Sequence, residues 1–273
     1  MSITETAPAK LNLALHVTGR RDDGYHLLDS LVAFTVLGDR VRLEPGPLAL
    51  RIDGPFAADL STDVNLCLRA ARLAGADAAI TLTKTLPVAS GIGGGSADAA
   101  AVLRGLARMG HALPARPERL GSDVPVCLSS APARMQGAGE ILTPLPPLPG
   151  LSVVLANPGI ALSTPQVFAA LDRRDNPGLP AIPCFTGLAD LATWLAGTRN
   201  DLEPAALILA PVIGQVLDGL RTTGAAFARM SGSGATCFGI YATADTARIA
   251  ANALKQHGWW AVATELAPPL MPR

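Results

Sequence analysis

A glycine-rich segment is the part of this sequence whose residue types most directly indicate chemistry. It consists of Pro87, Val88, Ala89, Ser90, Gly91, Ile92, Gly93, Gly94, Gly95, Ser96 and Ala97. A strand-like run at 80–86 precedes it, and an apolar run at 99–107 that predicts a helix follows it. Without Cβ atoms, backbone N–H groups can turn toward an anion, and the positive end of the helix points to the same place. The segment predicts a phosphate-binding loop, with a flexible turn as the alternative.

The loop differs from two common nucleotide-binding motifs. The P-loop needs Lys followed by Ser or Thr after its last glycine, whereas Ser96 and Ala97 follow Gly95. The dinucleotide fingerprint needs a third glycine where this chain has Ser96. Ser96 can offer a hydroxyl donor or a metal contact, and Asp98 is predicted in the first helical turn, where a carboxylate is favoured.

Two polar side chains lie near the start of a predicted strand at 11–17. Apolar residues alternate along this run, so Lys10, Asn12 and His16 share its other face. Lys10 and Asn12 could meet a ligand together, although a solvated face is an equal alternative.

An aromatic pair and an acid complete the candidate residues. Tyr25 and His26 end a polar turn, where they could stack on a planar ring or simply pack. Asp123 lies between Ser122 and Val124 on a turn constrained by Pro125, so it could be a general base or a helix N-cap.

The composition limits the classes of partner. A length of 273 residues favours two domains, and 49% hydrophobic residues allow real cores. The formal net charge of zero argues against nucleic acid or an anionic membrane as a partner. No basic leader and no run of ~18 apolar residues is present, which favours a cytoplasmic protein. The four isolated cysteines predict buried, reduced thiols rather than a zinc site.

The elements that position these residues are predicted as alternating strands and helices. Strands are expected at 30–35 and 41–44 with a turn at Gly38 and Asp39, and again at 48–52, 151–156 and 237–242. Helices are expected at 65–74, capped by Asp63 or Ser61, at 163–171, after Pro204 with a break at Pro211, and at 246–257, capped by Asp245. Residues 145–150 have the composition of a linker, and 172–186 form a loop that could be a flexible wall.

Two glycine-rich segments, 87–98 and 231–234, resemble parts of one protein family. Residues 87–98 resemble the glycine-rich ATP loop of the GHMP kinases, the superfamily of galactokinase, homoserine kinase and mevalonate kinase, and 231–234 resemble its C-terminal loop. Segments 7–13, 21–26 and 120–125 narrow the resemblance to members whose acceptor alcohol carries a cytidine diphosphate. The similarity extends over nearly the whole chain.

The resemblance implies a fold and an activity. The expected fold is α/β (α+β), with an S5-like domain at 1–149, a ferredoxin-like domain at 150–273 and the active site in the cleft between them. The expected activity is ATP-dependent phosphorylation of a small-molecule alcohol in isoprenoid precursor synthesis, with Mg²⁺ as cofactor. A monomer or a weak homodimer is compatible with the sequence.

The resemblance also implies roles for single residues. Lys10 and Asp123 are expected to be catalytic. Asn65 and Lys84 are expected near the nucleotide, together with the loop at 87–97. On the acceptor side, Asn12 is expected to meet hydroxyl groups, and Tyr25, His26 and Phe185 are expected to recognise cytosine.

One departure and two alternatives remain at this point. The segment 111–119 is shorter than is usual in the family, which leaves the position of Asp123 open. The chain could be another GHMP kinase with a homoserine-type or mevalonate-type substrate, or a nucleotide-binding regulator without activity. The Tyr25-His26 pair argues against the first alternative, and the presence of both Lys10 and Asp123 argues against the second.

Overall fold

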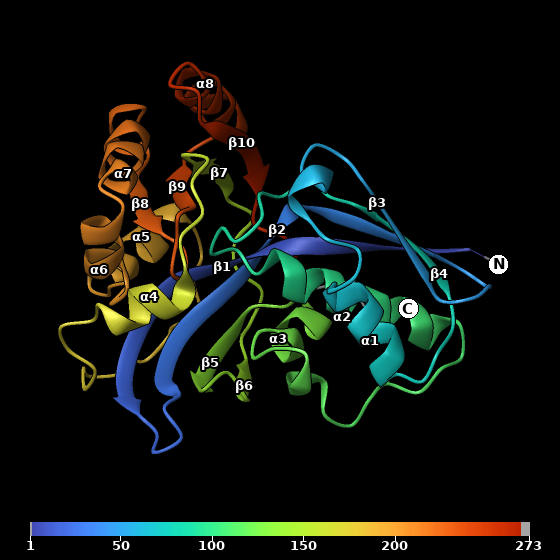
Figure 1. Cartoon of the computed structure of the whole chain (residues 1–273). Helices are drawn as coiled ribbons and strands as arrows, with labels where there is room; N and C mark the ends of the chain where they lie inside the picture. The colour runs from blue at the N-terminus through green and yellow to red at the C-terminus, as the bar shows by residue number, and fades with distance from the viewer. Residues whose placement is uncertain (1, 269–273) are drawn as a thin grey trace. The chain divides into compact units, whose positions relative to one another are not determined.

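The computed structural model describes residues 2–268 and shows a mixed α/β protein with two β-sheets (Figure 1). Contacts divide the chain into two compact units. Unit 1 comprises Met1–Lys10, Leu37–Val88 and Gly93–Ser130, and unit 2 comprises Leu11–Val36, Ala89–Ile92 and Ala131–Arg273. Because the two units alternate along the sequence, no single position separates them. The domain boundary expected between residues 149 and 150 stays a prediction.

Strands and helices are mixed along the chain, with three strands at the start and four consecutive helices between the seventh and eighth strands. The strands are β1 (Ile3–Arg20), β2 (His26–Glu44), β3 (Ala49–Asp53), β4 (Ala79–Thr83), β5 (Ala133–Gly137), β6 (Ile141–Pro144), β7 (Ser152–Asn157), β8 (Phe227–Met230), β9 (Cys237–Tyr241) and β10 (Trp260–Glu265). The helices are α1 (Leu66–Leu73), α2 (Gly94–Arg108), α3 (Val124–Ser129), α4 (Thr164–Ala169), α5 (Leu188–Ala196), α6 (Glu203–Leu209), α7 (Val212–Thr222) and α8 (Ala244–Lys255). Two short 3₁₀ helices are η1 (Ala57–Asp59) and η2 (Pro117–Arg119).

The strands form two sheets. The first has the order β3-β4-β2-β5-β6, and β1 also pairs with β2. Along this order only the β3–β4 pair is parallel. The second sheet has the order β10-β7-β9-β8 and is antiparallel throughout.

Strand β2 replaces two predicted strands, so the turn expected at Gly38 and Asp39 is wrong. The strand requires glycine at position 38, because a Cβ there would clash with the carbonyl oxygen of Ala7. Asp39 is fully buried, and its carboxylate accepts hydrogen bonds from the backbone N–H groups of Thr85 and Leu86. A polar residue that usually marks a turn is therefore stabilised inside a sheet by partners distant in sequence.

Helix α2 is the centre of unit 1. It packs between α1 and α3 (Figure 1). Its alanine-rich face is buried, and a Cβ at Gly105 would lie 2.4 Å from Leu43 on β2. Small side chains on α2 therefore let the helix lie close to the sheet.

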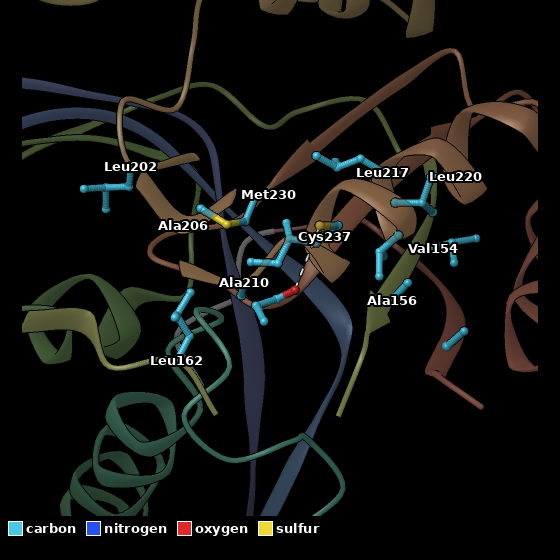
Figure 2. Packing of buried hydrophobic residues seen from close by; sticks show 14 of the residues in the cluster. Val154, Ala156, Leu162, Leu202, Ala206, Ala210, Leu217, Leu220, Met230 and Cys237 are labelled. Atoms are coloured by element: carbon cyan, nitrogen blue, oxygen red, sulfur yellow. Dashed lines mark hydrogen bonds between the residues drawn. The ribbon is translucent and has the colours of Figure 1, made fainter. Parts of the chain in front are cut away.

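The core of unit 2 forms between the second sheet and helices that include α6, α7 and α8. Figure 2 shows Val154 and Ala156 from β7, Met230 from β8 and Cys237 from β9 converging with Leu217 and other side chains of α6 and α7. These residues are at most 8% exposed. Their burial is the principal stabilising term for this unit.

Two predicted helix N-caps are wrong, because side chains other than the expected ones form the caps of α1 and α8. Asn65 caps α1, since its side chain accepts from the N–H of Cys67 at 2.9 Å. Thr243 caps α8 in place of Asp245. The break predicted at Pro211 is confirmed, because α6 and α7 meet there at 119°.

Two further findings concern membranes and thiols. Within residues 2–268 no single helix has the length and hydropathy to cross a membrane, and only the bent pair α6 and α7 meets the two criteria jointly.

Cys67, Cys127 and Cys237 are buried, as predicted, but Cys184 is exposed. The expectation of four buried thiols is wrong at Cys184, which lies in the irregular segment before α5.

Candidate active site

The two predicted catalytic residues form an ion pair within unit 1. The ammonium of Lys10 lies 2.7 Å from Oδ2 of Asp123. Lys10 is buried on β1, whereas the side chain of Asp123 is 27% exposed. Asp123 occupies the position before α3, but its side chain makes no capping hydrogen bond there. Asp123 thus contacts Lys10 even though the preceding segment at 111–119 is short.

The glycine loop enters helix α2 earlier than predicted. The helix begins at Gly94 rather than Ala99, so Asp98 lies beyond the first turn, and the expectation for Asp98 is wrong. Gly93 precedes the helix with φ of 65°, and no side chain caps the helix. The first N–H groups of a helix have no partner inside it, so those of Gly94, Gly95 and Ser96 are available to an anion.

Lys84 lies in a buried charge cluster beside this helix. Its ammonium contacts a carboxylate oxygen of Asp39 and lies 2.7 Å from Oδ2 of Asp98. All three side chains are at most 4% exposed. Burial raises the pKa of Asp98 to about 7, although the Lys84 ammonium opposes this shift. Burial also lowers the pKa of Lys84, but the carboxylates of Asp98 and Asp39 outweigh it and raise that pKa above the usual value.

The cluster holds the start of α2 rather than offering a free ammonium. A Cβ at Gly94 would lie 3.1 Å from Nζ of Lys84, so the glycine permits this close approach. Asn65 is likewise engaged, because its Oδ1 caps α1 and its Nδ2 donates to the carbonyl of Ser61 at 3.3 Å. Both residues predicted near the nucleotide therefore have structural partners in unit 1.

Loop residues Ala89–Ile92 belong to unit 2 and contact residues 231–234, a second glycine-serine loop. A Cβ at Gly91 would lie 2.5 Å from the carbonyl oxygen of Ser231, and Gly91 has φ of 75°. The hydroxyl of Ser231 donates to the carbonyl of Gly91 at 3.1 Å and accepts from the N–H of Asn12 at 3.1 Å. The second loop thus joins the predicted acceptor residue Asn12 to part of the glycine loop.

The predicted aromatic pair, Tyr25 and His26, lies in unit 2, but the two side chains have different environments. Tyr25 is 62% exposed, which leaves its ring accessible. His26 stacks on Phe168 with ring centroids 4.6 Å apart, and its Nε2 is buried without a hydrogen-bond partner among the described residues. Burial, assisted by Arg20 and Arg174, lowers the pKa of His26 and favours the neutral ring.

Phe185 lies in a buried position of its own. It is 9% exposed and makes an edge contact with Trp194 at 5.7 Å between ring centroids. The segment that leads to it is held by side chains, since Asp29 accepts from the N–H of Leu179 at 2.9 Å and His16 bonds the carbonyl of Pro177 at 2.9 Å. The loop expected as a wall is therefore tied to β1 and β2.

Some residues of this region were missed from the sequence. Asn200 donates to the carbonyls of Met230 and Gly232 at 2.9 and 2.8 Å and so holds the second loop. Phe168 supports His26, and Ser30 contacts Asn12. None of them has a local motif in the sequence that marks the contact.

Comparison with known proteins defines the class of this chain. Residues 64–129 match the model of the GHMP kinases N terminal domain, and 179–258 match that of the GHMP kinases C terminal. A homoserine kinase structure from Cytophaga hutchinsonii has the same fold, with a TM-score of 0.65 at 18% identity over 98% of this chain and 95% of that one. Fold and matched segments together define a GHMP kinase.

Full-length relatives narrow the class. A 4-diphosphocytidyl-2-C-methyl-D-erythritol kinase of Paracoccus denitrificans is 61% identical, with 97% of each chain covered. One of Ruegeria pomeroyi is 54% identical over 95% of this chain and 98% of its own. A crystal structure of 4-(cytidine 5'-diphospho)-2C-methyl-D-erythritol kinase matches with a TM-score of 0.77 and 36% identity, covering 97% of this chain and 99% of that one. The chain belongs to the 4-diphosphocytidyl-2-C-methyl-D-erythritol kinase family of GHMP kinases.

This membership confirms the resemblance, the α/β fold class and the kinase activity class predicted from the sequence. A kinase of this superfamily uses ATP and acts on a small molecule. The alternatives with homoserine-type or mevalonate-type substrates are not favoured. Solved structures of a homoserine kinase and a mevalonate kinase share 18% and 14% identity with this chain, whereas the named relatives described above share 54–61%.

Proposed function

We propose that this chain transfers the γ-phosphoryl group of ATP to the 2-hydroxyl of 4-diphosphocytidyl-2-C-methyl-D-erythritol, giving the 2-phosphate and ADP in the non-mevalonate route to isoprenoid precursors. The observation that carries the proposal is the Lys10–Asp123 ion pair, in a chain 61% identical to a kinase of that name.

The pair supplies the proton chemistry of the proposed reaction. A carboxylate oxygen of Asp123 accepts the proton of the attacking hydroxyl. Lys10 stabilises the ionised carboxylate before the reaction and negative charge on the transferred group during it. The partial exposure of Asp123 supports this role, because a base must be accessible to its substrate.

Residues of the glycine loop bind the phosphates of ATP in this proposal. The uncapped N–H groups at the start of α2 support it, because they would otherwise lack partners. The Lys84 cluster contributes by fixing the first turns of α2. Asn65, at the start of α1, is proposed to lie near the bound nucleotide.

Mg²⁺ is part of the proposal. In the described part of the chain no group of three His, Cys, Asp or Glu side chains is placed to hold a metal ion. This suits Mg²⁺ bound mainly by substrate phosphates and water, with the hydroxyl of Ser96 as a protein contact. The ion would neutralise phosphate charge.

The acceptor side is proposed from four residues. Tyr25 stacks on the cytosine, and its exposed ring supports this role. His26 offers its unpaired Nε2 to a cytosine donor. Asn12 meets acceptor hydroxyls, and Phe185 forms a second aromatic wall through its contact with Trp194. We also propose a cytoplasmic monomer or weak homodimer.

A coupled assay of ADP release tests the proposal. The purified chain is supplied with Mg²⁺-ATP and, in parallel, with the cytidine substrate, homoserine or mevalonate. Of the three acceptors, only the cytidine substrate is expected to give ADP release. Release with homoserine or mevalonate instead would move the chain to another GHMP kinase activity, and nucleotide binding without release on any acceptor would support a regulator.

A further inference from the structure

Ser30 on β2 is hydrogen-bonded to two groups, the side-chain amide of Asn12 and the backbone carbonyl of Ala14. Its hydroxyl oxygen lies 2.8 Å from Nδ2 of Asn12 and 2.7 Å from the carbonyl oxygen of Ala14. Ser30 is fully buried, so these contacts are not exchanged with bulk water.

The single hydroxyl proton of Ser30 decides which way the Asn12 amide faces. The carbonyl of Ala14 can only accept, so Ser30 donates its proton there. Its oxygen can then only accept from Asn12, which places the NH₂ group of the amide against Ser30. A flipped amide would bring two acceptor oxygens together without a proton between them.

This orientation leaves Oδ1 of Asn12 as an unused acceptor. It is buried and has no hydrogen-bond partner within residues 2–268. The backbone N–H of Asn12 is already bonded to Ser231. A Cβ at position 232 would lie 3.3 Å from Oδ1, so Gly232 keeps this side of the amide uncrowded. A buried acceptor without a partner is costly, and a ligand that donates a proton would remove the cost.

We propose that Ser30 is a positioning residue that presents Oδ1 of Asn12 as an acceptor to one hydroxyl of the substrate alcohol. The inference rests on the proposed function. Besides the hydroxyl that is phosphorylated, the methylerythritol portion carries hydroxyls at carbons 1 and 3, and one of them donates to Oδ1. Ser30 thereby selects substrates with a hydroxyl at that place over analogues with hydrogen or an ether.

Matched variants at position 30 isolate the hydroxyl. Ser30→Thr keeps it, and Ser30→Val has the same shape as threonine without it. Any crowding by the extra atoms is common to both. Ser30→Ala serves as a smaller variant if neither folds, and melting temperature and the KM for ATP show whether the fold is intact.

The kinetics of these variants should separate the effect of the Ser30 hydroxyl from the effect of side-chain size. Ser30→Thr should stay within about threefold of the wild type, whereas Ser30→Val should lose roughly 10- to 100-fold in kcat/KM for the cytidine substrate with the KM for ATP unchanged. One of the 1-deoxy and 3-deoxy acceptor analogues should be a poor substrate for the wild type. The ratio of kcat/KM for the full substrate to kcat/KM for that deoxy analogue should fall toward one in Ser30→Val or Ser30→Ala, because the Asn12 amide is then free to turn.

Three outcomes are informative. Equal kinetics for Ser30→Thr and Ser30→Val would overturn the inference, as would a deoxy penalty of the same size in wild type and variants. A wild type without activity on the cytidine substrate would overturn the proposed function, and the inference would fall with it.

Discussion

Lys10 and Asp123 are separated by 113 positions in the sequence, yet their charged atoms lie 2.7 Å apart within unit 1. One residue comes from the interior of a long strand and the other from the start of a six-residue helix. A buried ammonium needs a carboxylate partner, and this one keeps its other oxygen available.

Removing either member of this pair should abolish most turnover. We expect Asp123→Asn to lower kcat by roughly 10²–10⁴, because the amide cannot accept the hydroxyl proton. Lys10→Ala should have a comparable effect, since it removes the charge that stabilises the transferred group. Steady-state kinetics check both, with circular dichroism as the control for folding. Near-normal turnover in either variant would end the assignment.

Tyr25 should contribute to binding of the cytidine substrate rather than to the chemical step. Loss of stacking in Tyr25→Ala should raise its KM by about 5- to 100-fold, which corresponds to ~1–3 kcal/mol. Tyr25→Phe retains the ring and is the matched control. The KM for ATP should not change in either variant, and an unchanged KM for the cytidine substrate in Tyr25→Ala would refute the stacking role.

The buried cluster of Lys84, Asp39 and Asp98 should respond unequally to substitution. At pH 8, above the raised pKa of Asp98 of about 7, Lys84→Met leaves two buried carboxylates without a cation and should cost about 3–5 kcal/mol in free energy of unfolding. Asp98→Asn keeps an oxygen for the ammonium and removes one of the two negative charges, so it should be far milder. Urea unfolding of the two variants checks this order. A loss in Asp98→Asn as large as that in Lys84→Met would contradict it.

The same cluster should make stability depend on pH. The pKa of Asp98 is raised from 3.8 to about 7, so between these values the native state holds a proton that the unfolded state releases. This contribution is full below pH 4 and is lost as the pH rises through 7. Asp98→Asn should therefore gain stability relative to wild type between pH 5 and pH 8. The comparison of ΔΔG at the two pH values checks the sign, and a gain at the lower pH would contradict it.

His16 should give a pH dependence of the opposite sign. Its Nε2 accepts from the N–H of Arg199 at 3.2 Å, and burial lowers its pKa. The unfolded state then binds more protons below pH 6.5, so stability present above that pH is lost as the pH falls. His16→Gln should reduce the slope of unfolding free energy between pH 6.5 and 5. His26→Gln should remove a separate component of the same sign, and an unchanged slope in both variants would contradict the assignment.

The fold class and the pairing of Lys10 with Asp123 could be predicted because their signals are local or belong to the family. Alternation marked β1, the glycines marked the loop, and Pro211 marked the break between α6 and α7. Asp123 was found through a short motif, although the sequence left its role as base or cap open. The structure shows that its side chain does not cap.

The contacts that were missed depend on partners distant in sequence. Asp39 looked like a turn residue because nothing nearby shows the Lys84 ammonium that accompanies it inside the sheet. Ser30 was placed in a strand, but the register that brings it to Asn12 is set by the pairing of β1 with β2. Pattern alone does not specify such registers when the strands are long.

The burial of Lys10 and Lys84 has a practical consequence for labelling. The chain has three lysines, and the third, Lys255 at the end of α8, is exposed. Arginine carries the rest of the basic charge. Amine-reactive dyes or surface-coupling reagents should therefore modify Lys255 and the α-amino group of the chain, so the protein can be attached to a sensor chip through these two amines while Lys10 and Lys84 stay unmodified.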